Sequence, residues 1–96
     1  MIIRVFRVWI KPANETEFEE KYRGISVPFM KSCDGMEAVW IGKPMEATTG
    51  SYVMVSHWTS RKSLEDSLGA NWNEPHIPAG MEHLVENCTV DHFEMM

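Results

Sequence analysis

The alternation of apolar and polar positions predicts four strands. Residues 2–10 and 51–58 are rich in β-branched and aromatic side chains, and residues 36–41 and 85–95 alternate over part of their length. Successive side chains of a strand point to opposite faces of a sheet, so each segment presents two different surfaces. In residues 51–58, one surface carries aromatic, sulfur-bearing or polar side chains, and the other carries valines and a histidine.

The residues between the first two strands have the period of an amphipathic helix. The apolar stripe recurs at spacings of four, three and four, and consists of Phe18, Tyr22, Ile25 and Phe29. Asn14 followed by Glu17 is typical of a capping box at a helix start. Pro28 lies inside the stripe and disfavours a helical conformation for the residue before it, so we expect a kink or a break within residues 24–28.

A second helix is predicted after the third strand. Thr59 or Ser60 is a suitable N-cap, and Gly69 ends the helical segment. Residues 70–80 are irregular, and residues 81–84 are expected to add one helical turn. The order strand, helix, strand, strand, helix, strand predicts an α+β, ferredoxin-like βαββαβ fold, in which both helices cover one face of a four-stranded antiparallel sheet.

The other face of this sheet needs cover from outside the chain. Its expected members are Phe6, Val8, Tyr52, Met54 and Trp58. The residues expected beneath the helices are Val53, Val55 and His57. Several rings together exceed the apolar patch that a soluble monomer usually exposes. We therefore predict a homodimer, a dimeric α/β barrel, with a cavity for a small hydrophobic or aromatic ligand between the sheet and the partner subunit.

Length and charge narrow the classes of partner. The 96 residues are expected to form one domain, residues 1–96. A net charge of −5 without a cluster of Lys and Arg argues against nucleic acid, and an acidic surface fits an anionic membrane poorly. Arginines interrupt the apolar N-terminal run, and no apolar stretch approaches the roughly 20 residues of a membrane span. We therefore expect a cytoplasmic protein.

A few polar and aromatic residues are candidates for chemistry. His76 can act as a general base, because an unperturbed histidine has a pKa near 6.5, or can be an ordinary loop residue. Arg4 can reach an anionic oxygen of a ligand, or can pair with an acidic residue such as Asp91. Trp58 is either a stacking platform or a core aromatic. Trp72 either closes the cavity or fastens its loop to the domain.

Metal and thiol chemistry receive no support from residue spacing. His76, His83 and His92 are separated by seven and nine positions, which fits no compact metal-binding motif. Cys33 and Cys88 lie far apart along the chain and are expected to be free thiols. We therefore predict no metal site.

Three segments together resemble the antibiotic biosynthesis monooxygenase (ABM) family, a family of small dimeric α/β barrels. They are KPANETEF at residues 11–18, VPFMKSCDGM at residues 27–36 and HWTS at residues 57–60. The junction HWTS, where a Trp at the end of the third strand precedes the N-cap of a helix, is the most recognisable of them. The resemblance covers nearly the whole chain and implies the same fold that the order of elements predicts.

The resemblance implies an activity and some of its residues. Some members oxidise polycyclic phenols with O₂ and no cofactor, in an apolar pocket that favours the deprotonated substrate. A family Trp corresponds to Trp58. Met54 stands where some of these enzymes have a pocket Asn, and methionine cannot donate a hydrogen bond to an oxyanion. The leading prediction is a cofactor-independent monooxygenase of an aromatic or quinol-like small molecule, in which His76 or Arg4 handles the phenolate.

The predicted pocket leaves two other functions open. Its substrate-binding walls are expected to be Phe6, Tyr52, Met54 and Trp72. The same pocket can belong to a non-catalytic binding or stress-response module. A haem-binding relative is the third reading: the haem-degrading members carry an Asn, a Trp and a His, of which the His corresponds to His76, whereas Phe6 and Ser67 occupy the other two positions.

Overall fold

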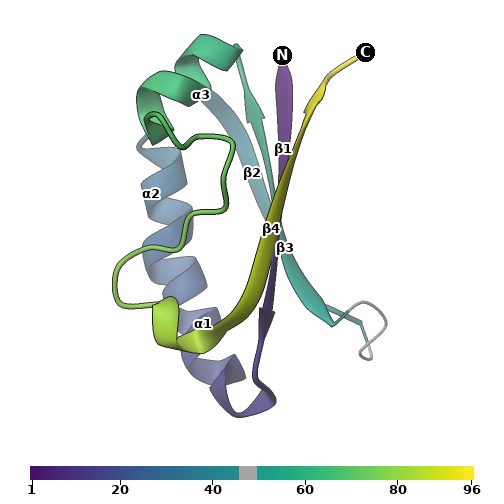
Figure 1. Ribbon diagram of the computed structural model, residues 1–96, viewed down its shortest axis with the longest axis vertical. Coiled ribbons are helices and arrows are strands. Elements are labelled where there is room, and N and C mark those ends of the chain that lie inside the picture. Colours follow the sequence, from purple (N-terminus) through teal and green to yellow (C-terminus); the bar gives the residue numbers. More distant parts are fainter. Residues whose placement is uncertain (46–49) are drawn as a thin grey trace.

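The chain folds into one antiparallel sheet with a layer of helices on one face (Figure 1). The computed structural model describes residues 1–45 and 50–96. The strands are β1 (Ile2–Ile10), β2 (Met36–Gly42), β3 (Ser51–Trp58) and β4 (Val85–Glu94), in the order β2-β3-β1-β4. All neighbouring pairs are antiparallel, so the predicted ferredoxin-like fold is confirmed.

The helical layer contains short segments of three helix types. They are η1 (Pro12–Asn14), α1 (Glu15–Lys21), η2 (Tyr22–Ser26), α2 (Val27–Lys31), α3 (Arg61–Leu68) and η3 (Glu82–Leu84). Figure 1 shows α1 and α2 running alongside the sheet, with α3 at one end, and the loop after α3 returning on the same side. No helix within residues 1–45 and 50–96 is long and apolar enough to cross a membrane.

The helical run continues through Pro28 without a break, and the irregularity expected within residues 24–28 is a change of helix type. η2 is a π-helical turn, in which the Val27 N–H donates to the Tyr22 carbonyl five residues earlier. Val27 keeps helical dihedral angles of φ −65° and ψ −47°. Proline lacks an N–H, and its ring crowds the carbonyl four residues before it in an α-helix. The wider turn therefore accommodates Pro28 without ending the helix.

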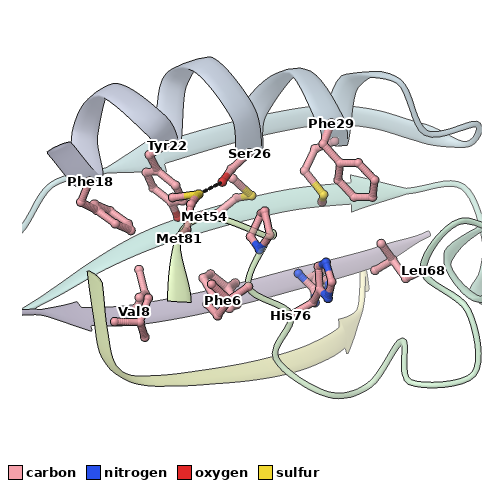
Figure 2. Close-up of a pocket in the computed structure, with 15 residues that line it drawn as sticks. Phe6, Val8, Phe18, Tyr22, Ser26, Phe29, Met54, Leu68, His76 and Met81 are labelled. Atoms are coloured by element: carbon pink, nitrogen blue, oxygen red, sulfur yellow. Dashed lines mark hydrogen bonds between the residues drawn. The ribbon is translucent and has the colours of Figure 1, made fainter. Parts of the chain in front are cut away.

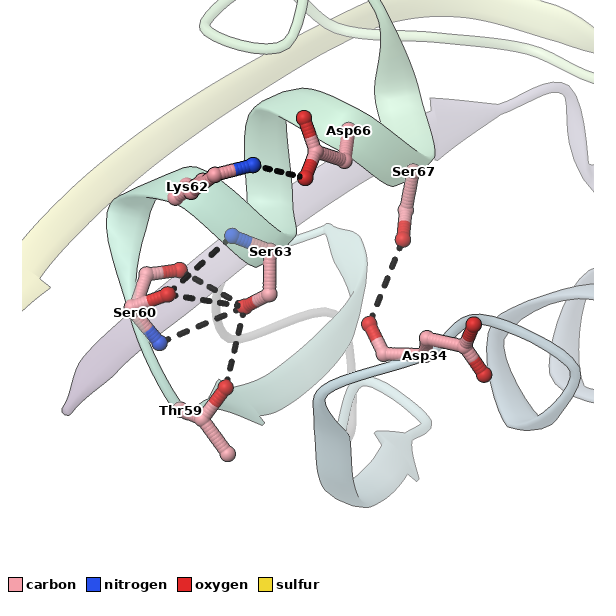
Figure 3. Close-up of polar contacts among 7 residues, drawn as sticks. All are labelled: Asp34, Thr59, Ser60, Lys62, Ser63, Asp66 and Ser67. Carbon is pink, nitrogen blue, oxygen red and sulfur yellow. Dashed lines mark hydrogen bonds and ion pairs between the residues drawn. The ribbon is translucent and has the colours of Figure 1, made fainter.

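The helix ends follow the local sequence signals only in part. Ser60 is the N-cap of α3: its hydroxyl accepts from the Ser63 N–H, while the Ser63 hydroxyl accepts from the Ser60 N–H (Figure 3). Gly69, with φ +81°, ends this helix as predicted. Asn14 is the N-cap of α1, but within the described residues its side chain caps no N–H, so the capping box predicted with Glu17 is not formed.

The helices cover the sheet face that carries the large side chains, so the predicted assignment of the two faces is wrong. The covered face includes Phe6, Val8, Tyr52, Met54 and Trp58, each at most 6% exposed. Phe6 pairs with Met54 and Val8 pairs with Tyr52 across β1 and β3, which places them on one face. Rings remove more apolar area from water than valines do, so covering them with helices gives the chain a larger core of its own.

The open face of the sheet carries the smaller side chains and two exposed rings. Val53, Val55 and His57 lie here, half-buried, rather than beneath the helices as predicted. Trp40 pairs with Val55 and is 54% exposed, and its ring centroid lies 4.9 Å from that of His57. Phe93 of β4 is also 54% exposed. An apolar surface therefore remains on this side of the described chain.

Candidate functional site

A mainly apolar cavity opens between the helical layer and the sheet (Figure 2). β1 and β3 form its floor, the helical run from α1 to α2 forms its roof, and the loop between α3 and η3 closes one side. From the sequence, a cavity was predicted on the sheet face away from the helices. The observed cavity lies beneath the helices, because they cover the face that carries the large side chains.

The cavity floor is formed by alternate residues of two strands, and its roof by residues on one side of the helical run. Phe6 of β1 and Met54 of β3 lie opposite each other on the covered face and form the floor. Tyr22 and Ser26 are four residues apart and lie on one side of the helix, and Figure 2 shows both side chains pointing toward the sheet. The Ser26 hydroxyl donates to Met81 Sδ at 3.5 Å, which joins the roof to the segment before η3.

Arg4 brings a positive charge to the cavity. Its side chain is 5% exposed, and within the described residues it forms no ion pair and its Nε has no hydrogen-bond partner. The guanidinium carbon lies 5.9 Å from the ring centroid of Phe6. Burial lowers the pKa of Arg4 to about 10, so the group remains cationic at neutral pH.

Tyr22 presents a hydroxyl to the same cavity. In the described part of the chain this hydroxyl has no hydrogen-bond partner, although the residue is 4% exposed. Burial raises the pKa of Tyr22 above its ordinary value, and the Arg4 cation opposes this increase. The phenol therefore stays protonated and can donate to a ligand oxygen.

His76 lies at the mouth of the cavity, in the loop after α3. The residue is exposed, and it borders both the cavity and an adjoining polar hollow. Its ring centroid is 6.5 Å from that of Phe29 in the roof. An imidazole with access to both the cavity and solvent can accept a proton from a bound molecule and release it to water.

The adjoining hollow is mainly polar and is lined in part by Asn71, Trp72 and Glu74. The Trp72 ring centroid lies 5.0 Å from that of His92, and the Arg61 guanidinium carbon lies 4.9 Å from the Trp72 ring centroid. These contacts connect the loop to β4 and to α3. Of the two roles predicted for Trp72, the structure thus supports fastening of the loop, since the ring borders the polar hollow and not the apolar cavity.

The structure brings some of the predicted site residues together and separates others. Those that line the cavity are Arg4, Phe6, Met54 and His76. Trp58 is 0% exposed in the core, where its Nε1 donates to Ser56 Oγ at 3.0 Å. Tyr52 lies elsewhere on β3, and its hydroxyl donates to Glu19 Oε2 at 2.6 Å. Neither Trp58 nor Tyr52 is among the described residues that line the cavity.

Several lining residues were not predicted for the site. They are, among others, Tyr22, Ser26, Phe29 and Met81. Tyr22 and Phe29 belong to the apolar helical stripe, which indicates burial but does not distinguish a core from a cavity wall. Ser26 lies four residues after Tyr22, a spacing that already places both on one side of an α-helix. That spacing was the available signal for Ser26.

The other titratable residues considered from the sequence lie outside the cavity. Cys33 and Cys88 are free thiols, and burial raises the pKa of each. Asp91 pairs with Arg7 at 3.6 Å and not with Arg4. Among the described residues, no group of three or more His, Cys, Asp or Glu side chains is placed to hold a metal ion.

His92 makes the stability of the fold sensitive to mild acid. It is half-buried, and its Nε2 has no hydrogen-bond partner within the described residues. Burial, and to a smaller extent the Arg4 cation, lower its pKa below the ordinary 6.5, while Asp91 opposes the decrease. The unfolded chain therefore binds a proton that the folded chain resists. The contribution of His92 to the free energy of unfolding is therefore expected to be fully present above pH 6.5 and to be lost as the pH falls through and below that value.

We expect the urea midpoint of the wild type to decrease between about pH 7 and pH 5, and His92→Gln to remove most of this decrease. The paired carboxylates Glu17 and Glu19 have lowered pKa values, so their contribution is lost only as the pH falls below 4.5. His76→Gln, at an exposed position, is the matched control, and its urea midpoint should decrease with pH as that of the wild type does. An unchanged pH profile in His92→Gln would contradict the assignment.

Comparison with known proteins identifies a family. The family model described as antibiotic biosynthesis monooxygenase matches residues 1–80. No curated protein matches the chain. Several solved structures of low sequence identity share the fold. At this level of identity, the similarity concerns the fold alone.

Three of these structures illustrate the range of the fold. A variant of SnoaB, a cofactor-independent oxygenase from Streptomyces nogalater, is 18% identical with a TM-score of 0.74, over 98% of this chain and 91% of its own. The haem degrader MhuD from Mycobacterium tuberculosis, with two haems in its active site, is 13% identical with a TM-score of 0.73, over 99% and 95%. A conserved protein from Methanosarcina mazei is 14% identical with a TM-score of 0.74, over 100% and 94%.

Proposed function

The chain belongs to the antibiotic biosynthesis monooxygenase family, and on that basis we propose that it is a cofactor-independent oxygenase of a flat aromatic or quinol-like molecule. The observation that carries the proposal is the apolar cavity between sheet and helices, which combines apolar walls with one buried cation, one phenol and one imidazole at its mouth. Small-molecule sites are typically of this kind, with few polar groups among apolar walls.

The chemistry proposed for the cavity requires deprotonation of the substrate. A phenol or an anthrone reacts with O₂ far more readily as its anion. His76 accepts the proton at the mouth, while Phe6 and Met54 below and Phe29 above hold the ring away from water. For an anthrone, the CH₂ group becomes a carbonyl. One atom of O₂ enters the product, and the other leaves as water with the two hydrogens, so the substrate itself supplies the electrons.

We also propose that the protein is a homodimer that associates through the open sheet face. This face carries Val5, Val53 and Val55 on the two central strands, with Trp40 and Phe93 at the sides. The two rings at the sides are each 54% exposed. Two identical apolar sheets can pack face to face around a two-fold axis and bury these side chains. The ligand cavity lies on the opposite side of each sheet and stays open in such a dimer.

Oxygen uptake tests the enzymatic proposal. In the presence of a metal chelator, we expect uptake with anthrone or with members of a hydroquinone series. His76→Gln should lower kcat/KM by roughly 100-fold, because a positioned general base contributes about this factor. His83→Gln is the control and should retain the wild-type rate, since His83 binds Glu17 outside the cavity.

The alternatives predict different results. Binding of these aromatics without oxygen uptake would support the non-catalytic binding module. A Soret shift on titration with haem would support the haem-binding reading. Oxygen uptake that is unaffected by His76→Gln would keep the enzyme but remove His76 from its role as base.

A further inference from the structure

Arg4 is an exception among the arginines of this chain. The three others, Arg7, Arg23 and Arg61, each pair with a carboxylate and are largely exposed. Arg4 lies on the same strand as Arg7 but on the covered face, and within residues 1–45 and 50–96 it has no acidic partner. A buried charge without a partner destabilises a fold, because it loses hydration without gaining an ion pair. An anion that enters the cavity would supply the missing partner.

Two more unsatisfied polar groups surround Arg4. Within the described residues, the buried side-chain nitrogens and oxygens without a hydrogen-bond partner are Arg4 Nε, the Tyr22 hydroxyl and His92 Nε2. Arg4 and Tyr22 line the cavity together, and His92 is the cross-strand partner of Arg4 on β4. The Arg4 cation is near enough to Tyr22 and to His92 to lower the pKa of each, and all three groups can donate a hydrogen bond. Donors around a cation form a site for an anionic oxygen.

The position of Arg4 also indicates what is attached to that oxygen. Arg4, Leu68 and His76 border both the apolar cavity and the polar hollow. A ligand that places its charge at Arg4 therefore has its apolar body in the cavity and its polar edge toward the hollow. Glu74 lines the hollow, and its negative charge would repel a second anionic group of the ligand.

We propose that the cavity selects flat aromatic molecules with a single negative charge, and that the anionic oxygen, carboxylate or phenolate, binds the Arg4 guanidinium and the Tyr22 hydroxyl. This rests on the proposed function only in taking the same cavity as the ligand site. It defines the class of ligand for an oxygenase and for a binding module alike.

Paired probes of equal shape test the charge requirement. We expect 2-naphthoate to bind roughly 10- to 100-fold more tightly than neutral 2-naphthamide, as measured by calorimetry, because a hydrogen bond to a charged group contributes about this ratio. Arg4→Met should abolish the preference while retaining binding of 2-naphthamide. Arg7→Met is the matched control, on the same strand but the other face, and should keep the wild-type preference.

A second measurement separates phenolate from carboxylate recognition. The absorbance of bound 2-naphthol reports its ionisation, and the pH of half-ionisation should be lower in the wild-type complex than in free 2-naphthol. In Arg4→Met the bound and free values should coincide. A preference for 2-naphthoate without this shift assigns the site to carboxylates, and the shift without the preference assigns it to phenolates.

Separate controls distinguish an effect on ligand binding from effects on folding and on activity. Arg4→Met should melt at or above the wild-type temperature, because it removes an unpaired buried charge, and Arg4→Lys should retain part of the preference. Three results would each overturn the inference: equal affinity for 2-naphthoate and 2-naphthamide in the wild type together with no shift in the ionisation of bound 2-naphthol, binding of none of the probes, or an intact preference in Arg4→Met. An anion preference without any oxygen uptake would support the inference and contradict only the proposed oxygenase.

Discussion

Replacing Trp58 by Ala is expected to lower the free energy of unfolding by about 3–5 kcal/mol, the range for a fully buried tryptophan. The side chain is 0% exposed, packs in the same core as Leu64, and loses the hydrogen bond from its Nε1 to Ser56 Oγ. A loss of this size is a large part of the stability of a domain this small. Urea denaturation followed by circular dichroism measures it, and the variant should be largely unfolded at moderate urea concentrations.

Trp40 is the matched control for this substitution, because it lies on the opposite face of the sheet and is 54% exposed. Trp40→Ala should destabilise the protein far less, and its effect should disappear on dilution if the open face is a contact between copies. The effect of Trp58→Ala should persist at every protein concentration. A Trp58→Ala variant that unfolds like the wild type but no longer consumes oxygen would instead make Trp58 a site residue.

Introducing a charge at Val55 is expected to convert the proposed dimer into monomers. Val55 lies on the open face, between Val5 on β1 and Trp40 on β2, close to its centre. In a two-fold dimer, Val55→Asp places two carboxylates in an apolar contact without partners, which is strongly unfavourable. We expect the dissociation constant to rise by roughly 100-fold or more, since a desolvated unpaired charge costs several kcal/mol.

Sedimentation velocity at micromolar concentration distinguishes the two states. Val55→Thr, which has nearly the same shape and no charge, should remain dimeric. The cavity residues lie on the other face, so 2-naphthoate should still bind to the Val55→Asp monomer. A wild-type protein that sediments as a stable 11.1 kDa species under these conditions would contradict the dimer.

The strands and their order follow from the sequence because the relevant signals are local. The bounds predicted for the first and third strands agree with β1 and β3. Alternation also assigns the residues of each strand correctly to two faces. For example, it places Phe6 and Val8 of β1 on one face, and it does the same for Tyr52 and Met54 of β3. It does not indicate which face the helices cover. That choice depends on how much apolar area each packing buries, which is a property of the assembled chain.

The site residues likewise divide into those that local spacing predicts and those that depend on the folded structure. Arg4, Phe6 and Met54 share a face by alternation, so their proximity could be predicted even though the face was wrong. Tyr22 and Ser26 share a helix face at a spacing of four residues, but that spacing does not distinguish a core from a cavity wall. His76 lies in an irregular loop, where no periodic signal fixes the direction of a side chain.

The π turn has a consequence for how this compartment can be remodelled. The π turn holds one residue more than the α-helical turn it replaces. A deletion within a regular α-helix rotates everything beyond it by about 100°. A deletion within η2 would instead be absorbed by a return to α-helical winding, which would leave Phe29 and Met30 facing the chamber. This part of the ceiling can therefore lose a residue without opening the chamber to water.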